Sequence, residues 1–171
     1  LSFPPVGDRS LFGMLEPSLN MQSRMIDIRD RAALADAVQE VQPEIVLHMA
    51  AQALVRRSYR EPVETYETNV MGTVNLLEAL APCEELRAVL VITSDKVYQN
   101  NEEGRPFTEE DPLGGDDPYS SSKAACEIAT SSLAKSLFAE KNVHIATGRA
   151  GNVIGGGDFS EDRLIPDIWR A

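Results

Sequence analysis

The sequence lacks the features that would attach it to a membrane or a nucleic acid. No apolar run approaches the roughly 20 residues that a membrane span needs. The segment from Leu1 to Asp8 lacks the basic and then apolar pattern of a signal peptide. Basic residues are outnumbered, 16 against 27 acidic ones, and the net charge is -11. Because nucleic acids and anionic membranes bind basic surfaces, we expect neither as a partner.

Cysteine is also scarce. Cys83 and Cys126 stand alone, without C-x-x-C spacing or a histidine cluster, so no metal site is predicted. A reducing, cytoplasmic setting fits this usage best. The acidity does not exclude an anionic small substrate, because a few arginines and backbone amides can hold a diphosphate.

A glycine-rich G-x-G-x-x-G turn is missing too, so a complete dinucleotide site cannot be predicted from this chain alone. The chain starts at Leu1 instead of a methionine and ends at Ala171 within an expected helix. We therefore expect a fragment of a longer protein, with one buried core in its 171 residues.

Short apolar runs alternate along the chain with stretches that carry apolar residues on one helical face. The expected strands are 45–49, 89–92 and 143–146, and the expected helices run from an Asp30 cap to Pro43, from Pro62 to Pro82, over 119–140 and near Pro166. Residues 1–18 read as an irregular connection. This alternation predicts an α/β domain with a doubly wound parallel sheet and helices on both faces.

Polar clusters follow the predicted strands, where ligands of parallel sheets bind. Thr93-Ser94-Asp95-Lys96 follows the second strand, and Arg149-Ala150-Gly151-Asn152 follows the third. Tyr119 and Lys123 lie one helical turn apart, so the ammonium can favour the phenolate and make the tyrosine a base. A solvated helix face is the alternative for such a pair. Its place after a long polar loop, 93–118, favours the functional interpretation.

The order of Ser94, Tyr119 and Lys123 resembles the catalytic set of the extended short-chain dehydrogenases. Further segments resemble motifs of that family in the same order: 48–52, 69–73 and 149–153. The resemblance covers nearly the whole chain. It implies a Rossmann-like NAD-binding domain over 1–171, truncated at the N-terminus and lacking most of the substrate domain, which would begin at about residue 151.

Within this family, Asp95 followed by Lys96 resembles the CDP-glucose 4,6-dehydratases, whereas most sugar-nucleotide dehydratases carry Thr-Asp-Glu. The segments 116–120, 155–158 and 162–167 resemble the same branch. The resemblance implies a lyase of deoxysugar biosynthesis that converts CDP-glucose to CDP-4-keto-6-deoxyglucose. Another nucleotide-sugar dehydratase or an epimerase is the alternative. A non-catalytic dinucleotide-sensing relative is a third hypothesis, against which the intact Ser94, Asp95, Tyr119 and Lys123 set argues.

The resemblance also implies roles. Tyr119 would accept the 4-hydroxyl proton while Ser94 bonds that oxygen, and Asp95 would protonate the departing 6-hydroxyl. Lys123 would lower the pKa of Tyr119 and hold the nicotinamide ribose. Lys96 is left between a base for the C5 proton and a cation that stabilises the enolate.

The resemblance also implies which residues contact the two ligands. NAD would be bound by Asp27, Ile28, Ala50, Ala51, Gln52, Asn69, Thr93, Tyr119 and Lys123, and the substrate by Ser94, Asn152, Arg163 and Leu164. We interpret His48 as a hydrogen-bonded strand histidine and not as a base. A homo-oligomer formed through a bundle of two helices from each subunit is expected from the family.

Overall fold

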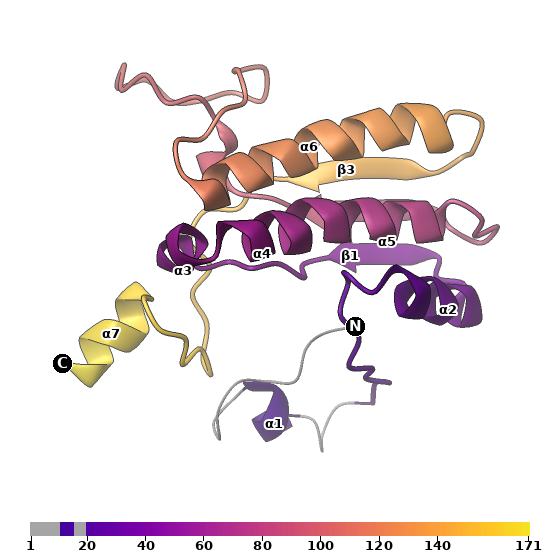
Figure 1. Cartoon of the computed structure of the whole chain (residues 1–171), viewed down its shortest axis with the longest axis horizontal. Coiled ribbons are helices and arrows are strands. Elements are labelled where there is room, and N and C mark those ends of the chain that lie inside the picture. The colour runs from indigo at the N-terminus through magenta and orange to yellow at the C-terminus, as the bar shows by residue number, and fades with distance from the viewer. Residues whose placement is uncertain (1–10, 16–19) are drawn as a thin grey trace.

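The computed structural model describes residues 11–15 and 20–171. Three parallel strands, β1 (Ile45–His48), β2 (Ala88–Ile92) and β3 (His144–Gly148), form one sheet in that order (Figure 1). The register aligns Val46 with Val89 and Val89 with Ile145. The predicted parallel α/β sheet is confirmed, with strand ends within two residues of those expected.

The main helices of this sheet are α2 (Arg31–Val41), α5 (Gly72–Leu80) and α6 (Pro118–Leu137), which pack in that order, α2 on α5 and α5 on α6. On β2, the side chains of Val89 and Val91 are 2% and 1% exposed, so they lie beneath the helical layer. On β1, Ile45 and Leu47 are 65% and 61% exposed, so they point to the opposite face.

The predicted parallel α/β fold is confirmed, and within the described ranges α2, α5 and α6 lie on one face of the sheet. The reason is topological. The crossovers from β1 to β2 and from β2 to β3 step in the same direction, and right-handed crossovers that share a direction place their helices on the same face.

Local sequence signals explain how the first of these helices begins and ends. The Asp30 carboxylate accepts the backbone N–H of Ala33 at 3.1 Å, which confirms the predicted N-cap. The helix stops at Gln42, whose φ of 46° is left-handed, directly before Pro43.

The predicted helix from Pro62 to Pro82 is present in three pieces. These are α4 (Pro62–Tyr66), a π-helical turn η2 (Glu67–Met71) and α5. The preceding helix α3 (Val55–Arg60) was not predicted, since it buries only Ser58 and shows no apolar period. At the start of α5, Gly72 allows the core side chain of Ile28 to approach, because a Cβ there would lie 2.4 Å from the Ile28 Cδ1.

Two other segments differ from expectation. Helix α1 (Leu11–Leu15) lies within the stretch predicted to be irregular, and the remainder of that stretch, 1–10 and 16–18, lies outside the described residues. The loop after β2 contains a 3₁₀ turn, η3 (Asp95–Val97), and a bridge between Tyr98 and Leu113.

The last helix, α7 (Leu164–Arg170), buries none of its residues and lies apart from the helical layer (Figure 1). In the part of the chain that the structure describes, no helix is both long enough and apolar enough to cross a membrane.

Candidate functional site

A cavity of about 190 Å³ lies at the carboxyl ends of the strands. Its walls come from the segments after β1, β2 and β3 and from the start of α6. Among its lining residues are Ala51, Thr93, Ser94, Asp95, Lys96, Tyr119, Lys123, Asn152 and Arg163. The fold thus brings together all five predicted catalytic residues. Asp27, Ile28, Ala50, Gln52, Asn69 and Leu164 do not line this cavity.

The 3₁₀ turn after β2 presents Asp95 and Lys96. The buried Ser94 hydroxyl accepts the N–H of Lys96 and donates to the Asp95 Oδ1, both at 3.2 Å. The Asp95 N–H is bonded to the carbonyl of Ala150 at 3.0 Å. Asp95 is therefore fixed through its backbone while its carboxylate stays exposed beside Ser94.

Tyr119 occupies the first turn of α6. Asp117 caps this helix by accepting the N–H groups of Tyr119 and Ser120 at 2.9 and 3.0 Å. The Ser58 hydroxyl oxygen also accepts the Tyr119 N–H, at 3.1 Å, a support that the unpredicted helix α3 supplies. Burial raises the pKa of Tyr119, while a hydrogen bond with Ser94 and the charge of Arg163 act to lower it.

Lys123, one helical turn after Tyr119, is bound to the end of β2. Its ammonium is buried and donates to the carbonyl of Ile92 at 3.1 Å. Burial lowers the pKa of Lys123. The expected effect of Lys123 on the pKa of Tyr119 and its expected contact with the nicotinamide ribose stay predictions.

Two predicted residues lie behind the cavity wall. Asn69, in the π-helical turn, is buried and holds the backbone of Gln52: its Oδ1 accepts the N–H at 2.8 Å and its Nδ2 donates to the carbonyl at 3.1 Å. Nδ2 also donates to the Ser122 hydroxyl at 2.9 Å. Asn69 thus fastens the loop after β1 to α6, and the amide of Gln52 is likewise bonded within the protein, to Leu54 and Thr65.

His48 was predicted to be a hydrogen-bonded strand histidine, and the structure shows it so. The buried His48 Nε2 lies 3.0 Å from the Thr73 hydroxyl. Burial, aided by the charge of Lys123, lowers the pKa of His48 to about 4. His48 is therefore neutral near pH 7.

Asp27, which was predicted to contact the adenine of NAD, is bound by Arg29. Its carboxylate accepts the Arg29 backbone N–H and Nε, each at 2.9 Å, and the Arg29 bond lowers the pKa of Asp27. The Ile28 side chain belongs to the hydrophobic core, so its backbone, and not its side chain, is what a ligand could contact.

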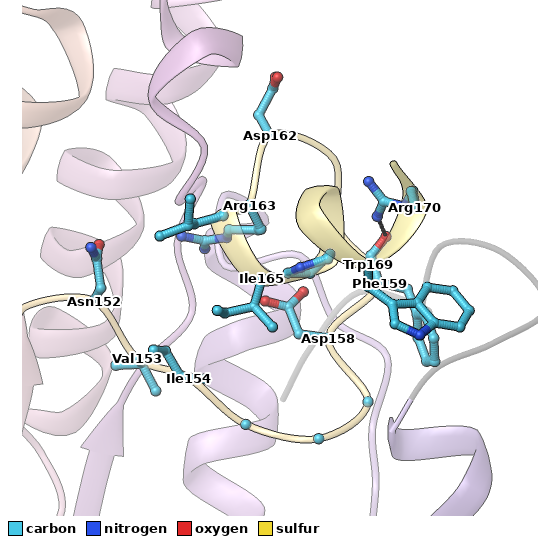
Figure 2. Close-up of a pocket in the computed structure, with 15 residues that line it drawn as sticks. Asn152, Val153, Ile154, Asp158, Phe159, Asp162, Arg163, Ile165, Trp169 and Arg170 are labelled. Carbon is cyan, nitrogen blue, oxygen red and sulfur yellow. Dashed lines mark hydrogen bonds between the residues drawn. The ribbon is translucent and has the colours of Figure 1, made fainter.

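A second cavity of about 560 Å³ adjoins the first, and Asn152, Val153 and Arg163 line both. Figure 2 shows Arg163 and Ile165 directed into the space between the loop from Asn152 to Asp158 and α7. The Arg163 Nε is buried and has no hydrogen-bond partner in the described part of the chain. An anionic group entering here would meet an unpaired donor.

The apolar lining of this second cavity was not predicted. Ile165 and Trp169 lie one helical turn apart on α7, and Phe159 precedes that helix (Figure 2). Their spacing is the signal that could have identified them. The segment is tied to α3 by the ion pairs of Arg56 with Asp162, at 2.9 Å, and of Arg60 with Glu161, at 3.1 Å.

Comparison with known proteins identifies relatives of this arrangement. CDP-glucose 4,6-dehydratase of Salmonella typhimurium is 50% identical over 95% of this chain and 46% of its own length. The structure of dTDP-glucose 4,6-dehydratase from Streptomyces venezuelae with NAD and DAU bound matches with a TM-score of 0.77 and 25% identity, over 90% of this chain and 45% of that one. The NAD complex of Thermus thermophilus UDP-glucose 4-epimerase matches with a TM-score of 0.70 and 31% identity, over 80% and 43%.

The chain therefore spans about half the length of these relatives. The family model described as GDP-mannose 4,6 dehydratase matches residues 14–167, which is most of the chain. A parallel sheet with Ser94, Tyr119 and Lys123 gathered at its carboxyl end accords with that match. The chain belongs to the GDP-mannose 4,6 dehydratase family.

Proposed function

We propose that the full-length protein is a CDP-glucose 4,6-dehydratase that works with NAD. The observation that carries this proposal is the exposed carboxylate of Asp95 in the same cavity as Tyr119, with the Ser94 hydroxyl bonded to it. An enzyme that only oxidises and reduces C4 needs a base, whereas elimination of water from C6 also needs an acid. The 50% identity to the Salmonella CDP-glucose 4,6-dehydratase supports the choice of nucleotide.

The residues present fit one end of a dinucleotide. The cavity has small side chains at Ala51, Ala53 and Gly151, so a flat ring can approach the strand ends closely. Its volume of about 190 Å³ suits a ring-sized group and is below the roughly 300–1,000 Å³ of pockets that enclose larger ligands. The Asp27 carboxylate and the Ile28 backbone would contact the adenine. The loop Ala50–Gln52 would contact the dinucleotide between the adenine and the cavity. NAD, when bound, supplies a hydride acceptor for C4 and returns the hydride to C6.

In the first step Tyr119, as the phenolate, takes the proton of the 4-hydroxyl while the hydride leaves C4, so a 4-ketone forms. Ser94 is buried next to both Tyr119 and Asp95, which suits it to hydrogen-bond the reacting oxygen. Lys123, with its ammonium anchored on the Ile92 carbonyl, would hold the nicotinamide ribose and supply a nearby positive charge when the phenolate forms.

In the second step the ketone acidifies C5–H. Loss of that proton and departure of the 6-hydroxyl form a C5=C6 bond, and Asp95 delivers the proton that converts the departing hydroxyl to water. Lys96 lies on the exposed rim of the cavity, where it would take the C5 proton as a free amine or, as an ammonium, stabilise the enolate while solvent water takes that proton. Hydride addition at C6 and a proton at C5 complete the 4-keto-6-deoxy sugar.

Residues from about 151 to 171 would begin the substrate-binding portion. Arg163 lines both cavities, so it can bond the substrate diphosphate where the two cavities meet, with the nucleoside in the larger one. Asn152 is shared in the same way, and Leu164 belongs to the apolar lining of the larger cavity.

The protein would act as a homo-oligomer in the cytoplasm. Exposed apolar side chains at Val63, Met71 and Ile128 lie on the adjacent helical segments α4–α5 and α6, a surface that supports a bundle of two helices from each subunit. The two buried free cysteines, Cys83 and Cys126, support a reducing compartment.

The test is to incubate the full-length protein with NAD and, separately, the CDP, dTDP, GDP and UDP esters of glucose. A 4,6-dehydratase gives a keto product lighter than the substrate by one water, and we expect the highest kcat/KM with CDP-glucose. A product of unchanged mass would identify an epimerase. NAD binding without turnover of any ester would identify a sensing relative.

A further inference from the structure

A buried ion pair that does not line the smaller cavity joins α6 to the segment after β3. Arg149 donates through Nε and Nη2 to the two carboxylate oxygens of Glu127 at 2.8 and 2.6 Å, and the two side chains are 17% and 6% exposed. The Thr93 hydroxyl donates to the same carboxylate at 2.7 Å. Burial acts to raise the pKa of Glu127, but the bonds from Arg149 and Thr93 outweigh it and hold the pKa below its ordinary value. Glu127 is therefore charged and fully bonded.

The pair connects three of the segments that carry the cavity residues, namely the end of β2, the segment after β3 and α6. Thr93 directly precedes Ser94 at the end of β2, and Glu127 lies one turn beyond Lys123 on α6. Arg149 lies between Gly148 and Ala150, whose carbonyls accept the N–H groups of Thr93 at 2.9 Å and Asp95 at 3.0 Å. These backbone bonds fix β2 against the segment after β3, and the Glu127 carboxylate fixes both against the helix that bears Tyr119.

The outer side of Arg149 supports the loop beyond the catalytic turn. Its guanidinium lies 4.7 Å from the centroid of the Tyr98 ring, and Nη1 donates to the Glu109 carbonyl at 3.3 Å. Tyr98 in turn stacks on Phe107 at 4.5 Å, nearly parallel. Arg149 therefore holds the turn after β2 at both ends, through Glu127 and Thr93 before the turn and through Tyr98 after it.

We propose that the Glu127–Arg149 pair is the positioning device of this site, which keeps Ser94 and Asp95 at the separation from Tyr119 that the two proton transfers require. The proposal rests on the dehydratase function proposed above. Two parallel N–H···O bonds fix distance and orientation in a way that an apolar contact does not. Buried ion pairs contribute little net stability compared with apolar side chains of similar volume. We therefore expect this pair to act on the geometry of the site and not on the stability of the fold.

The kinetic test uses the full-length protein. Glu127→Gln removes the charge and keeps the shape, whereas Arg149→Lys keeps a positive charge but loses the two parallel bonds. The control is Glu78→Gln, in the exposed Arg31–Glu78 pair of similar geometry at 2.7 and 2.6 Å. We expect kcat to fall about ten- to hundredfold in Glu127→Gln and in Arg149→Lys. KM should stay within about twofold, with Glu78→Gln close to wild type. A kcat in Glu127→Gln equal to that of Glu78→Gln, or lower melting temperatures with unchanged kcat, would overturn the proposal.

A second readout needs no substrate. The phenolate absorbance of each variant, minus that of the same variant carrying Tyr119→Phe, reports the titration of Tyr119 alone. Because the Ser94 hydroxyl acts to lower the pKa of Tyr119, displacement of Ser94 should raise it in Glu127→Gln and not in Glu78→Gln. An unmoved Tyr119 titration in Glu127→Gln contradicts the positioning role. A raised titration in a protein that converts no nucleotide glucose would leave the positioning role standing and refute the proposed function.

Discussion

The smaller cavity and the segment from Asn152 to Arg170 are built in opposite ways. Around the smaller cavity, Ser94, Tyr119 and Lys123 are held by hydrogen bonds to strands, a helix cap and one another. The other segment buries no residue of its helix α7, and exposed ion pairs to α3 hold it in place. Exposed ion pairs contribute about 0–1 kcal/mol each, so the second region is weakly fixed by comparison.

This difference matches a division of tasks. Proton transfer needs groups fixed to fractions of an ångström, whereas binding a nucleotide can use a surface that closes on its ligand. Substitutions in the first region should therefore change kcat, and substitutions in the second should change KM.

The largest effect should come from Tyr119→Phe in the full-length protein. The change deletes one hydroxyl and leaves the ring, the helix cap and the Ser58 contact in place. We expect kcat to fall toward the upper part of the 10²–10⁴ range of general acid–base catalysis, with an unchanged melting temperature. Near-normal turnover in this variant would mean that another group is the base.

Asp95→Asn should stop the reaction after the 4-ketone has formed, at the elimination of water. Asparagine keeps the backbone bond to Ala150 and can still accept from Ser94, but it cannot deliver a proton. We expect kcat to fall about 10²-fold or more and reduced nicotinamide to accumulate, as read by its absorbance. A 6-fluoro substrate should recover part of the rate, since fluoride needs the acid less. Equal slowing of both substrates with no reduced cofactor would place Asp95 in binding or in the first hydride transfer.

The third prediction concerns His48 in the first region and the pH dependence of the free energy of unfolding. The pKa of His48 is about 4 when folded against an ordinary 6.5, so the unfolded chain binds more protons between these values. Stability should therefore fall by about 3 kcal/mol as the pH drops from 6.5 to 4. His48→Gln can still donate to Thr73 and should flatten this part of the profile of melting temperature against pH. His144→Gln, at an exposed histidine, is the matched control and should leave the wild-type profile unchanged.

The smallest effect, and one of the opposite kind, is expected in the second region. Arg163→Gln removes a charge that lines both cavities, so it should raise KM for the nucleotide sugar about tenfold or more. The melting temperature should not change. The kcat should fall much less than in Tyr119→Phe. A large loss of kcat with an unchanged KM would erase the contrast between the two regions.

Much of the first region could be predicted from the sequence, because local patterns encode it. The apolar runs predicted the three strands, Asp30 predicted a helix start, and the polar residues at the strand ends predicted the cavity. The bond from the Lys123 ammonium to the Ile92 carbonyl and the Glu127–Arg149 pair could not be predicted. Both depend on which groups are brought together by segments that are distant in the sequence. Helix α3 was missed because its buried face is a single serine.

The central claim is tested most directly by following one deuterium atom. CDP-glucose that carries deuterium at C4 should be given to the full-length protein with NAD, and the product examined by mass spectrometry and NMR. If the residues at the strand ends direct an internal transfer and loss of water, the deuterium will be found at C6 of a 4-keto-6-deoxy sugar from the same molecule. Deuterium that remains at C4 of a product of unchanged mass, or that is lost to solvent, would contradict the account.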